Sequence, residues 1–208
     1  MHKVLPNGRF IYMVRDPVER LISRYMHDIC ECLHEDEPEV AFSGDPLSNR
    51  YISESLYFTQ FRQFTRYFDR EQFLIIDSER FRHHRKDTLR SVFRFLGVDD
   101  SFEHKAFEVV RHPTSGKRRK NSFGRALHKH LGGHVLKGLQ QLPLPMPLQR
   151  AISHRGDQAL YWLFSRPMER PRLDPEFRTS LNDIFRPEIE QFEEAVGQKF
   201  SSWLRSPG

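Results

Sequence analysis

The chain has 208 residues and a mass of 24.9 kDa, which suits one domain or one domain with a small addition. Hydrophobic residues make up 38% of it and charged residues 29%, a globular balance that excludes a disordered or collagen-like chain. No apolar run of about 18 residues occurs, so we expect no membrane partner. The two cysteines, Cys30 and Cys32, are too close together to staple a fold. These features favour a cytoplasmic location.

Positive charge is concentrated in one part of the sequence. The chain carries 33 basic and 28 acidic residues, but residues 109–156 contain ten Lys or Arg and no Asp or Glu. The remainder therefore has a net charge of 23 − 28 = −5. The basic segment is rich in Gly and Pro, which predicts a loop-rich region within a single domain over residues 1–208. It favours an anionic partner, but charge by itself does not choose among a nucleotide, a nucleic acid, a sulfated glycan and a membrane surface.

The first predicted elements are a buried strand over residues 9–14 and a helix that begins directly after it. The strand is an aromatic and β-branched run that follows a turn signal. Asp16 then supplies an N-cap carboxylate, Pro17 fits the first helical position, and Glu19 completes a capping box. Apolar residues recur at helical spacing and are expected to face the core: Val18, Ile22, Tyr25 and Ile29.

The middle of the chain continues this alternation of helix and strand. Residues 28–50 are acidic and broken by Pro and Gly, which predicts an irregular excursion. An amphipathic helix over residues 57–68 leads to a buried strand over residues 73–76. A helix over residues 89–96 then ends at Gly97 in the left-handed conformation. This order of elements predicts an α/β fold in which helices flank a parallel sheet.

The C-terminal part is predicted to be helical. Asp174 and Pro175 open a helix in the same way as Asp16 and Pro17. Pro187 is expected to start a separate last segment that ends at Gly197. Three apolar residues are expected to dock the tail: Phe200, Trp203 and Leu204.

A basic residue at the carboxyl end of the first predicted strand is the most informative feature of the sequence. Arg15 precedes a well-capped helix, where free N–H groups and the helix dipole attract phosphate. Its guanidinium can bind a phosphate in a bidentate manner, and the Ser23 hydroxyl, two turns into the helix, can add a donor. The alternative is that Arg15 pairs with a carboxylate such as Asp16 or Asp77, and that Ser23 is an ordinary solvated residue.

Residues 15–25, RDPVERLISRY, resemble the 3′-phosphate-binding segment of sulfotransferases that use 3′-phosphoadenosine 5′-phosphosulfate, written R-D-P-x-x-R-x-x-S-x-Y. Residues 71–98 and 185–204 are similar to bacterial and glycan-type members of that family as well. The resemblance implies a P-loop-NTPase-like sulfotransferase fold. It also implies transfer of a sulfuryl group from this nucleotide co-substrate to a hydroxyl or amine of a glycan or small-molecule acceptor. Arg15 and Ser23 would hold the 3′-phosphate.

In this family a basic, glycine-containing loop closes over the nucleotide, and residues 115–120 are the candidate in this chain. Gly116, Lys117 and Arg118 would surround the phosphate with a backbone N–H group and two cationic side chains. The alternative is an exposed basic turn that contacts nothing. We expect Tyr57 to pack against the sheet rather than to react.

One departure from the family pattern concerns the 5′-phosphosulfate. The family's loop for it, approximately P-K-x-G-T/S-T/S, lies upstream of the R-D-P segment, and this sequence contains neither that loop nor G-x-x-x-x-G-K-[ST]. We therefore expect the first strand, this loop and the family's usual Glu or His base to be missing, and we assign no catalytic residue. A fragment of a longer reading frame, a degenerate relative, or a loop supplied by another chain would each explain the departure.

Two alternatives to an active enzyme stay open. One is a catalytically inactive nucleotide- or glycan-binding remnant, and the other is a nucleic-acid-binding module built on residues 109–156. Phe123 is the only Phe, Trp or Tyr in the central part of that segment, so stacking on bases is poorly supported and nucleic acid is not the expected partner. Cys30, Cys32 and His34 fit no usual four-ligand zinc spacing, so we expect no metal. The sequence does not indicate an oligomeric state.

Overall fold

A computed structural model of the chain describes residues 3–31, 33, 36–109, 118–120 and 165–204. The chain forms two compact units. The first comprises residues 1–24, 37–111 and 171–208, and the second comprises residues 25–36 and 112–170. A single domain over residues 1–208 stays a prediction, and most of the basic segment 109–156 lies outside the described residues.

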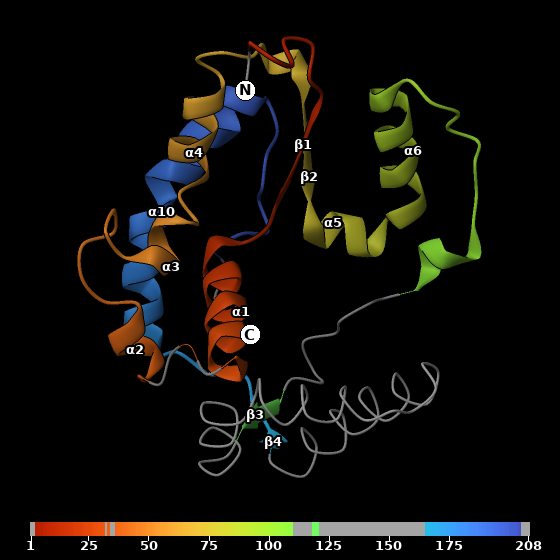
Figure 1. Ribbon diagram of the computed structural model, residues 1–208. Coiled ribbons are helices and arrows are strands. Elements are labelled where there is room, and N and C mark those ends of the chain that lie inside the picture. The colour runs from red at the N-terminus through yellow and green to blue at the C-terminus, as the bar shows by residue number, and fades with distance from the viewer. Residues whose placement is uncertain (1–2, 32, 34–35, 110–117, 121–164, 205–208) are drawn as a thin grey trace, which may run out of the picture. The chain divides into compact units, whose positions relative to one another are not determined.

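Two parallel strands form the centre of the first unit (Figure 1). β1 (Phe10–Val14) pairs with β2 (Phe73–Asp77), so that Phe10 lies opposite Phe73 and Val14 opposite Asp77. Parallel strands need a long crossover connection, and the chain between β1 and β2 supplies it with helices. The parallel sheet predicted from the sequence is confirmed.

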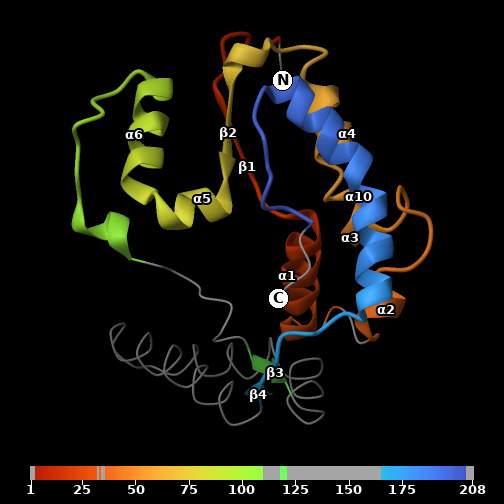
Figure 2. The same cartoon turned by 180° about the vertical axis from the view of Figure 1, so that it is seen from behind.

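Helices flank these strands on two sides. α4 (Tyr57–Phe64) and α10 (Pro175–Val196) lie together on one side, and α5 (Ser78–His83) and α6 (Arg85–Leu96) lie on the other, as Figure 1 and the rear view in Figure 2 both show. Aromatic rings fill the space between the strands and the α4–α10 pair. The Phe61 ring lies 5.1 Å from that of Phe73 and 5.6 Å from that of Phe192. The α/β fold is therefore as predicted.

The first strand is less buried than its composition predicts. Ile11 is 44% exposed and Met13 is 51% exposed, whereas Val14 is buried. Met13 pairs with Ile76 of β2, which is only 6% exposed. α5 and α6 pack on β2, so they cover the β2 side of this face and leave β1 accessible. The prediction of a buried first strand is therefore wrong for Ile11 and Met13.

The helix after β1 agrees with its predicted start and buried face. α1 (Pro17–Cys30) buries the four apolar residues that the spacing selects, Val18, Ile22, Tyr25 and Ile29. The irregular excursion predicted for residues 28–50 is too long, because α1 runs to Cys30 and a further short helix, α2 (Pro38–Ala41), lies within it. α3 (Arg50–Ser53) follows at its end.

The C-terminal helix contradicts the break predicted at Pro187. α10 has 22 residues and continues through Pro187, although proline removes one backbone hydrogen bond there. Phe185, Ile189 and Phe192 are buried along one face of α10, and this burial offsets the cost of the proline. The docked tail is confirmed, since the rings of Phe200 and Trp203 stack 4.1 Å apart.

Several smaller elements complete the described part of the chain. Two 3-10 helices are present, η1 (Arg70–Gln72) and η2 (Lys105–Glu108). Gly97 ends α6 with φ 72°, the left-handed conformation predicted for it. In the second unit, β3 (Arg118–Lys120) pairs antiparallel with β4 (Ser165–Pro167). Among the described residues, no helix is long and apolar enough to cross a membrane.

Candidate functional site

Arg15 lies where the sequence predicts it, between the carboxyl end of β1 and the first residue of α1. Its backbone N–H donates a hydrogen bond to the hydroxyl of Tyr57, 3.3 Å away. Tyr57 is buried, and burial raises its pKa to about 12, so the hydroxyl stays protonated near neutral pH. Tyr57 therefore packs beneath the turn and fixes the backbone that carries Arg15. That it does not react stays a prediction.

Asp16 also fixes the turn. Its Oδ1 accepts the N–H of Glu19 at 3.0 Å, which is the N-cap bond predicted for the start of α1. Its Oδ2 accepts the N–H of Leu204 at 2.8 Å, so the C-terminal tail is tied to the same turn. Asp16 is only 5% exposed, and both of its carboxylate oxygens have backbone donors.

The Arg15 side chain is part of a charged row that includes residues from both ends of the chain. Its Nη2 lies 3.9 Å from Glu19 Oε2, and Glu19 Oε1 lies 3.3 Å from Arg178 Nη2 on α10. The exposed fraction of the side chain falls along this row, from 27% at Arg15 to 22% at Glu19 and 10% at Arg178. Arg15 is thus the most exposed of these three side chains.

A carboxylate neighbour had been the alternative to phosphate binding at Arg15. The structure places Glu19 in that position, rather than Asp16 or Asp77. A separation of 3.9 Å makes this a loose ion pair, and a guanidinium has five N–H donors. The contact with Glu19 is therefore compatible with an anion bound at the exposed side of Arg15.

Arg20, the second arginine of the R-D-P-x-x-R pattern, joins α1 to the segment before α4. Its Nη1 donates to Ser55 Oγ at 3.2 Å, and its Nη2 donates to Glu54 Oε2 at 3.3 Å. Ser55 is 1% exposed, so this contact lies against the core. These two bonds tie α1 to the segment before α4 and hold the Arg20 side chain in place.

The remaining predicted site residues divide between the two units. Ser23 is half-buried on α1, about 9 Å along the helix axis from its first residue. Arg118 belongs to the second unit, where its Nε donates to Ser165 Oγ at 2.8 Å. Gly116 and Lys117 lie outside the described residues. A common site for Arg15, Ser23 and the loop residues stays a prediction.

Sequence reasoning missed Glu19 and Arg178 as parts of this site. The i,i+4 spacing of Arg15 and Glu19 is a signal that could have predicted their pairing. Arg178 carried no such signal, because 159 residues separate it from Glu19. Its Nε is buried and has no hydrogen-bond partner in the part of the chain that the structure describes.

The structure describes only part of the possible metal-binding cluster around Cys30. Cys30 is buried, with its Sγ 4.0 Å from Met168 Sδ, whereas Cys32 and His34 lie outside the described residues. No group of three or more His, Cys, Asp or Glu among the described residues could hold a metal ion.

Comparisons with known proteins find sulfotransferases both by sequence and by fold. Residues 2–133, more than half of the chain, match the family model described as "Sulfotransferase domain". Carbohydrate sulfotransferase 15 of Homo sapiens is 28% identical over 142 residues, covering 57% of this chain and 25% of that protein. The protein of the same name from Mus musculus is 27% identical with the same coverage. The chain thus spans about a quarter of the length of these curated relatives.

A solved structure supports the fold independently. The sulfotransferase from Alicyclobacillus acidocaldarius has a TM-score of 0.59 and 19% sequence identity to this chain. The match covers 99% of this chain and 61% of the other. It confirms the sulfotransferase fold predicted from the sequence. It does not test whether this chain lacks the family's first strand and 5′-phosphosulfate loop, so that absence stays a prediction.

Proposed function

The chain belongs to the sulfotransferase domain family, and on that premise we propose that it binds 3′-phosphoadenosine 5′-phosphosulfate and transfers the sulfuryl group of this nucleotide to an acceptor. Arg15 and Ser23 hold the 3′-phosphate of this nucleotide. Gly116, Lys117 and Arg118 close over the same phosphate. Transfer without a metal follows from the same resemblance.

The observation that carries the proposal is the fixed position of Arg15. Its backbone is held by Tyr57, and the adjacent turn is held by the two bonds of Asp16, so the guanidinium projects from a rigid base. It stands at the N-terminus of a 14-residue helix, whose dipole and free N–H groups favour an anion. Such prepositioning lowers the entropy lost when a phosphate binds.

The proposed reaction moves one sulfuryl group between two nucleophiles. The bond between sulfur and the bridging oxygen of the 5′-phosphate breaks, and a bond forms between sulfur and the acceptor oxygen or nitrogen. The acceptor loses a proton, and 3′-phosphoadenosine 5′-phosphate leaves. No described residue is assigned to the sulfate end, so Arg15 and Ser23 act by binding and orienting the nucleotide.

A glycan is the acceptor class that we favour. The curated relatives from human and mouse are named carbohydrate sulfotransferases, and this name supports a carbohydrate hydroxyl over a small-molecule amine. A nucleotide-binding protein without turnover is the second candidate, because the sequence contains no match to the family's 5′-phosphosulfate loop. A cytoplasmic location stays a prediction.

Calorimetric titration of the 208-residue chain with 3′-phosphoadenosine 5′-phosphate tests the proposal. We expect binding that weakens by about tenfold or more in Arg15→Ala, because one charge-assisted contact is lost. Adenosine 5′-monophosphate, which lacks the 3′-phosphate, should bind the unchanged chain more weakly by a similar factor. Arg82→Ala is the matched control, since Arg82 is an exposed arginine on α5 of the same unit.

Equal affinity for the two nucleotides, or equal affinity of the unchanged chain and Arg15→Ala, would show that Arg15 does not hold the 3′-phosphate. Transfer of radiolabelled sulfate from the donor to a glycan acceptor then separates the two candidates. Binding with transfer supports the enzyme, and binding without transfer supports the nucleotide-binding protein.

A further inference from the structure

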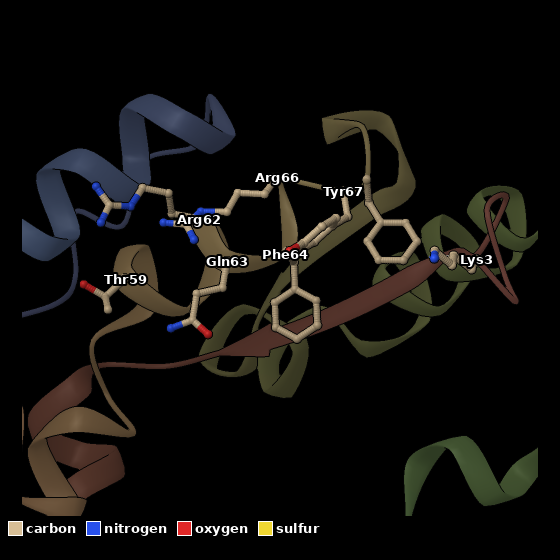
Figure 3. Close-up of a pocket in the computed structure, with 8 residues that line it drawn as sticks. Lys3, Thr59, Arg62, Gln63, Phe64, Arg66 and Tyr67 are labelled. Atoms are coloured by element: carbon tan, nitrogen blue, oxygen red, sulfur yellow. The ribbon is translucent and has the colours of Figure 1, made fainter. Parts of the chain in front are cut away.

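A groove of about 780 Å³ runs along α4 of the first unit and reaches the N-terminal end of β1. Its lining comes from the end of α4, from the turn that follows α4, and from the N-terminal segment. Figure 3 shows its side chains in a row, with Thr59 at one end and Lys3 at the other. Its volume is within the range of about 300 to 1,000 Å³ that is usual for small-molecule sites.

The end of the groove formed by Phe64 and Phe68 is separated from Arg15 by the length of β1, whereas Thr59 at the other end lies nearer to Arg15. The ring of Phe10, the first residue of β1, lies 4.5 Å from that of Phe68 on the groove floor and 6.4 Å from that of Phe64. Arg15 follows the last residue of the same strand. Five residues at about 3.3 Å each put the two ends about 16 Å apart. A nucleotide held at Arg15 therefore leaves the Lys3 end of the groove free.

The charge of the groove is positive. Lys3, Arg62 and Arg66 line it, and no Asp or Glu is among the described residues that do so. Within the described part of the chain, none of these three cations forms an ion pair. Arg20 and Arg50 of the same unit, by contrast, each pair with Glu54 within 3.3 Å. The three cations of the groove are thus available to an anionic ligand.

Aromatic rings and polar uncharged groups lie between these cations. Tyr67 is 63% exposed and Phe64 is 45% exposed, although large rings are usually more buried than this. Gln63 adds an amide that can donate and accept hydrogen bonds. The floor is firm, since the ring of Phe68 is buried against the cluster of Phe10 and Phe73.

We propose that this groove is a second anion-binding site and that it holds an acidic oligosaccharide. Exposed rings match the apolar faces of sugar rings, the amide matches their hydroxyl groups, and the arginines match carboxylates or sulfate esters with bidentate geometry. The role of this ligand as part of a glycan acceptor rests on the proposed function. The binding itself does not, because the Lys3 end of the groove lies apart from Arg15.

The test is titration of the 208-residue chain with a fully sulfated heparin-derived octasaccharide at physiological salt, without nucleotide. Arg62→Ala/Arg66→Ala should bind about tenfold more weakly or worse, because two charge-assisted contacts are lost. The matched control is Arg82→Ala/Lys105→Ala, which removes the same charge from two exposed positions of the same unit. Arg15→Ala should bind the octasaccharide as the unchanged chain does.

The proposal would be overturned if the control pair lost as much affinity for the octasaccharide as the groove pair, or if only Arg15→Ala lost affinity. It would also be overturned if a single-stranded oligonucleotide of matched charge bound the groove equally tightly. A measurement on the unchanged chain avoids any folding defect of the variants. Bound octasaccharide should slow acetylation of Lys3 several-fold relative to that of Lys105, and an unchanged ratio would contradict the proposal. Groove-dependent binding in a chain that fails to bind the nucleotide would refute only the proposed function.

Discussion

The two Asp-Pro helix starts of this chain allow the tie between the C-terminal tail and the Arg15 turn to be measured. Asp174 caps α10 at an exposed position, where its Oδ1 accepts the N–H groups of Glu176 and Phe177 at 2.9 and 3.2 Å. Asp16 caps α1 in the same way but is buried, and it also accepts the N–H of Leu204. The two aspartates thus share the cap and differ in burial and in this second, long-range bond.

This difference sets the expected free energies of unfolding. Asp174→Ala should cost about 1 kcal/mol, the usual value for an N-cap. Asp16→Ala should cost about 3 kcal/mol, because it removes a cap and also a charge-assisted bond worth about 2 kcal/mol. Asp16→Asn keeps one acceptor oxygen for Glu19 but turns an amide donor toward the N–H of Leu204. It should therefore cost about 2 kcal/mol, nearly all of it from the tail.

Urea unfolding followed by tryptophan fluorescence and by circular dichroism measures all three variants. Trp203 is buried in the docked tail, so its fluorescence reports release of the tail once Trp162, the other tryptophan of the chain, is replaced by Phe in every variant. Costs for Asp16→Ala and Asp174→Ala that agree within about 0.5 kcal/mol would refute the reasoning, because the bond to Leu204 would then contribute nothing. Full stability of Asp16→Asn would refute it as well.

Two further predictions concern the packing of α4 against its neighbours. Glu188 of α10 accepts both the N–H and the hydroxyl of Thr59, at 2.9 and 2.6 Å, so Glu188→Ala should lower the free energy of unfolding by about 3 kcal/mol. Urea unfolding checks this against Glu190→Ala, an exposed position on the same helix, and equal costs would contradict it. Burial raises the pKa of Tyr57 from an ordinary value of 10.0 to about 12, which stabilises the fold fully below pH 10 and progressively less as the pH rises toward 12. Between pH 10 and 12, the free energy of unfolding of the unchanged chain should therefore fall faster with pH than that of Tyr57→Phe, by about 1.4 kcal/mol for each pH unit. Parallel pH profiles of the two proteins would rule this out.

The local features of this protein could be predicted from the sequence because neighbours in the chain produce them. The turn from β1 into α1 depends on an apolar run, a capping aspartate and a proline, all within a few residues of Arg15. The left-handed end of α6 depends on Gly97 alone. The R-D-P pattern lies on that turn, and it indicated the sulfotransferase family to which the match with the family model assigns the chain.

Other features depend on contacts between distant parts of the chain, and only the tertiary structure decided them. Arg178 reaches Glu19 across 159 residues, and Leu204 reaches Asp16 across 188. α10 passes through Pro187 because its buried face is paired with α4 and the strands, which local propensity does not include. The groove exists because Lys3 and the end of α4 meet in the folded chain. Spacing along a sequence encodes the face of a helix, but it does not encode which distant face packs against it.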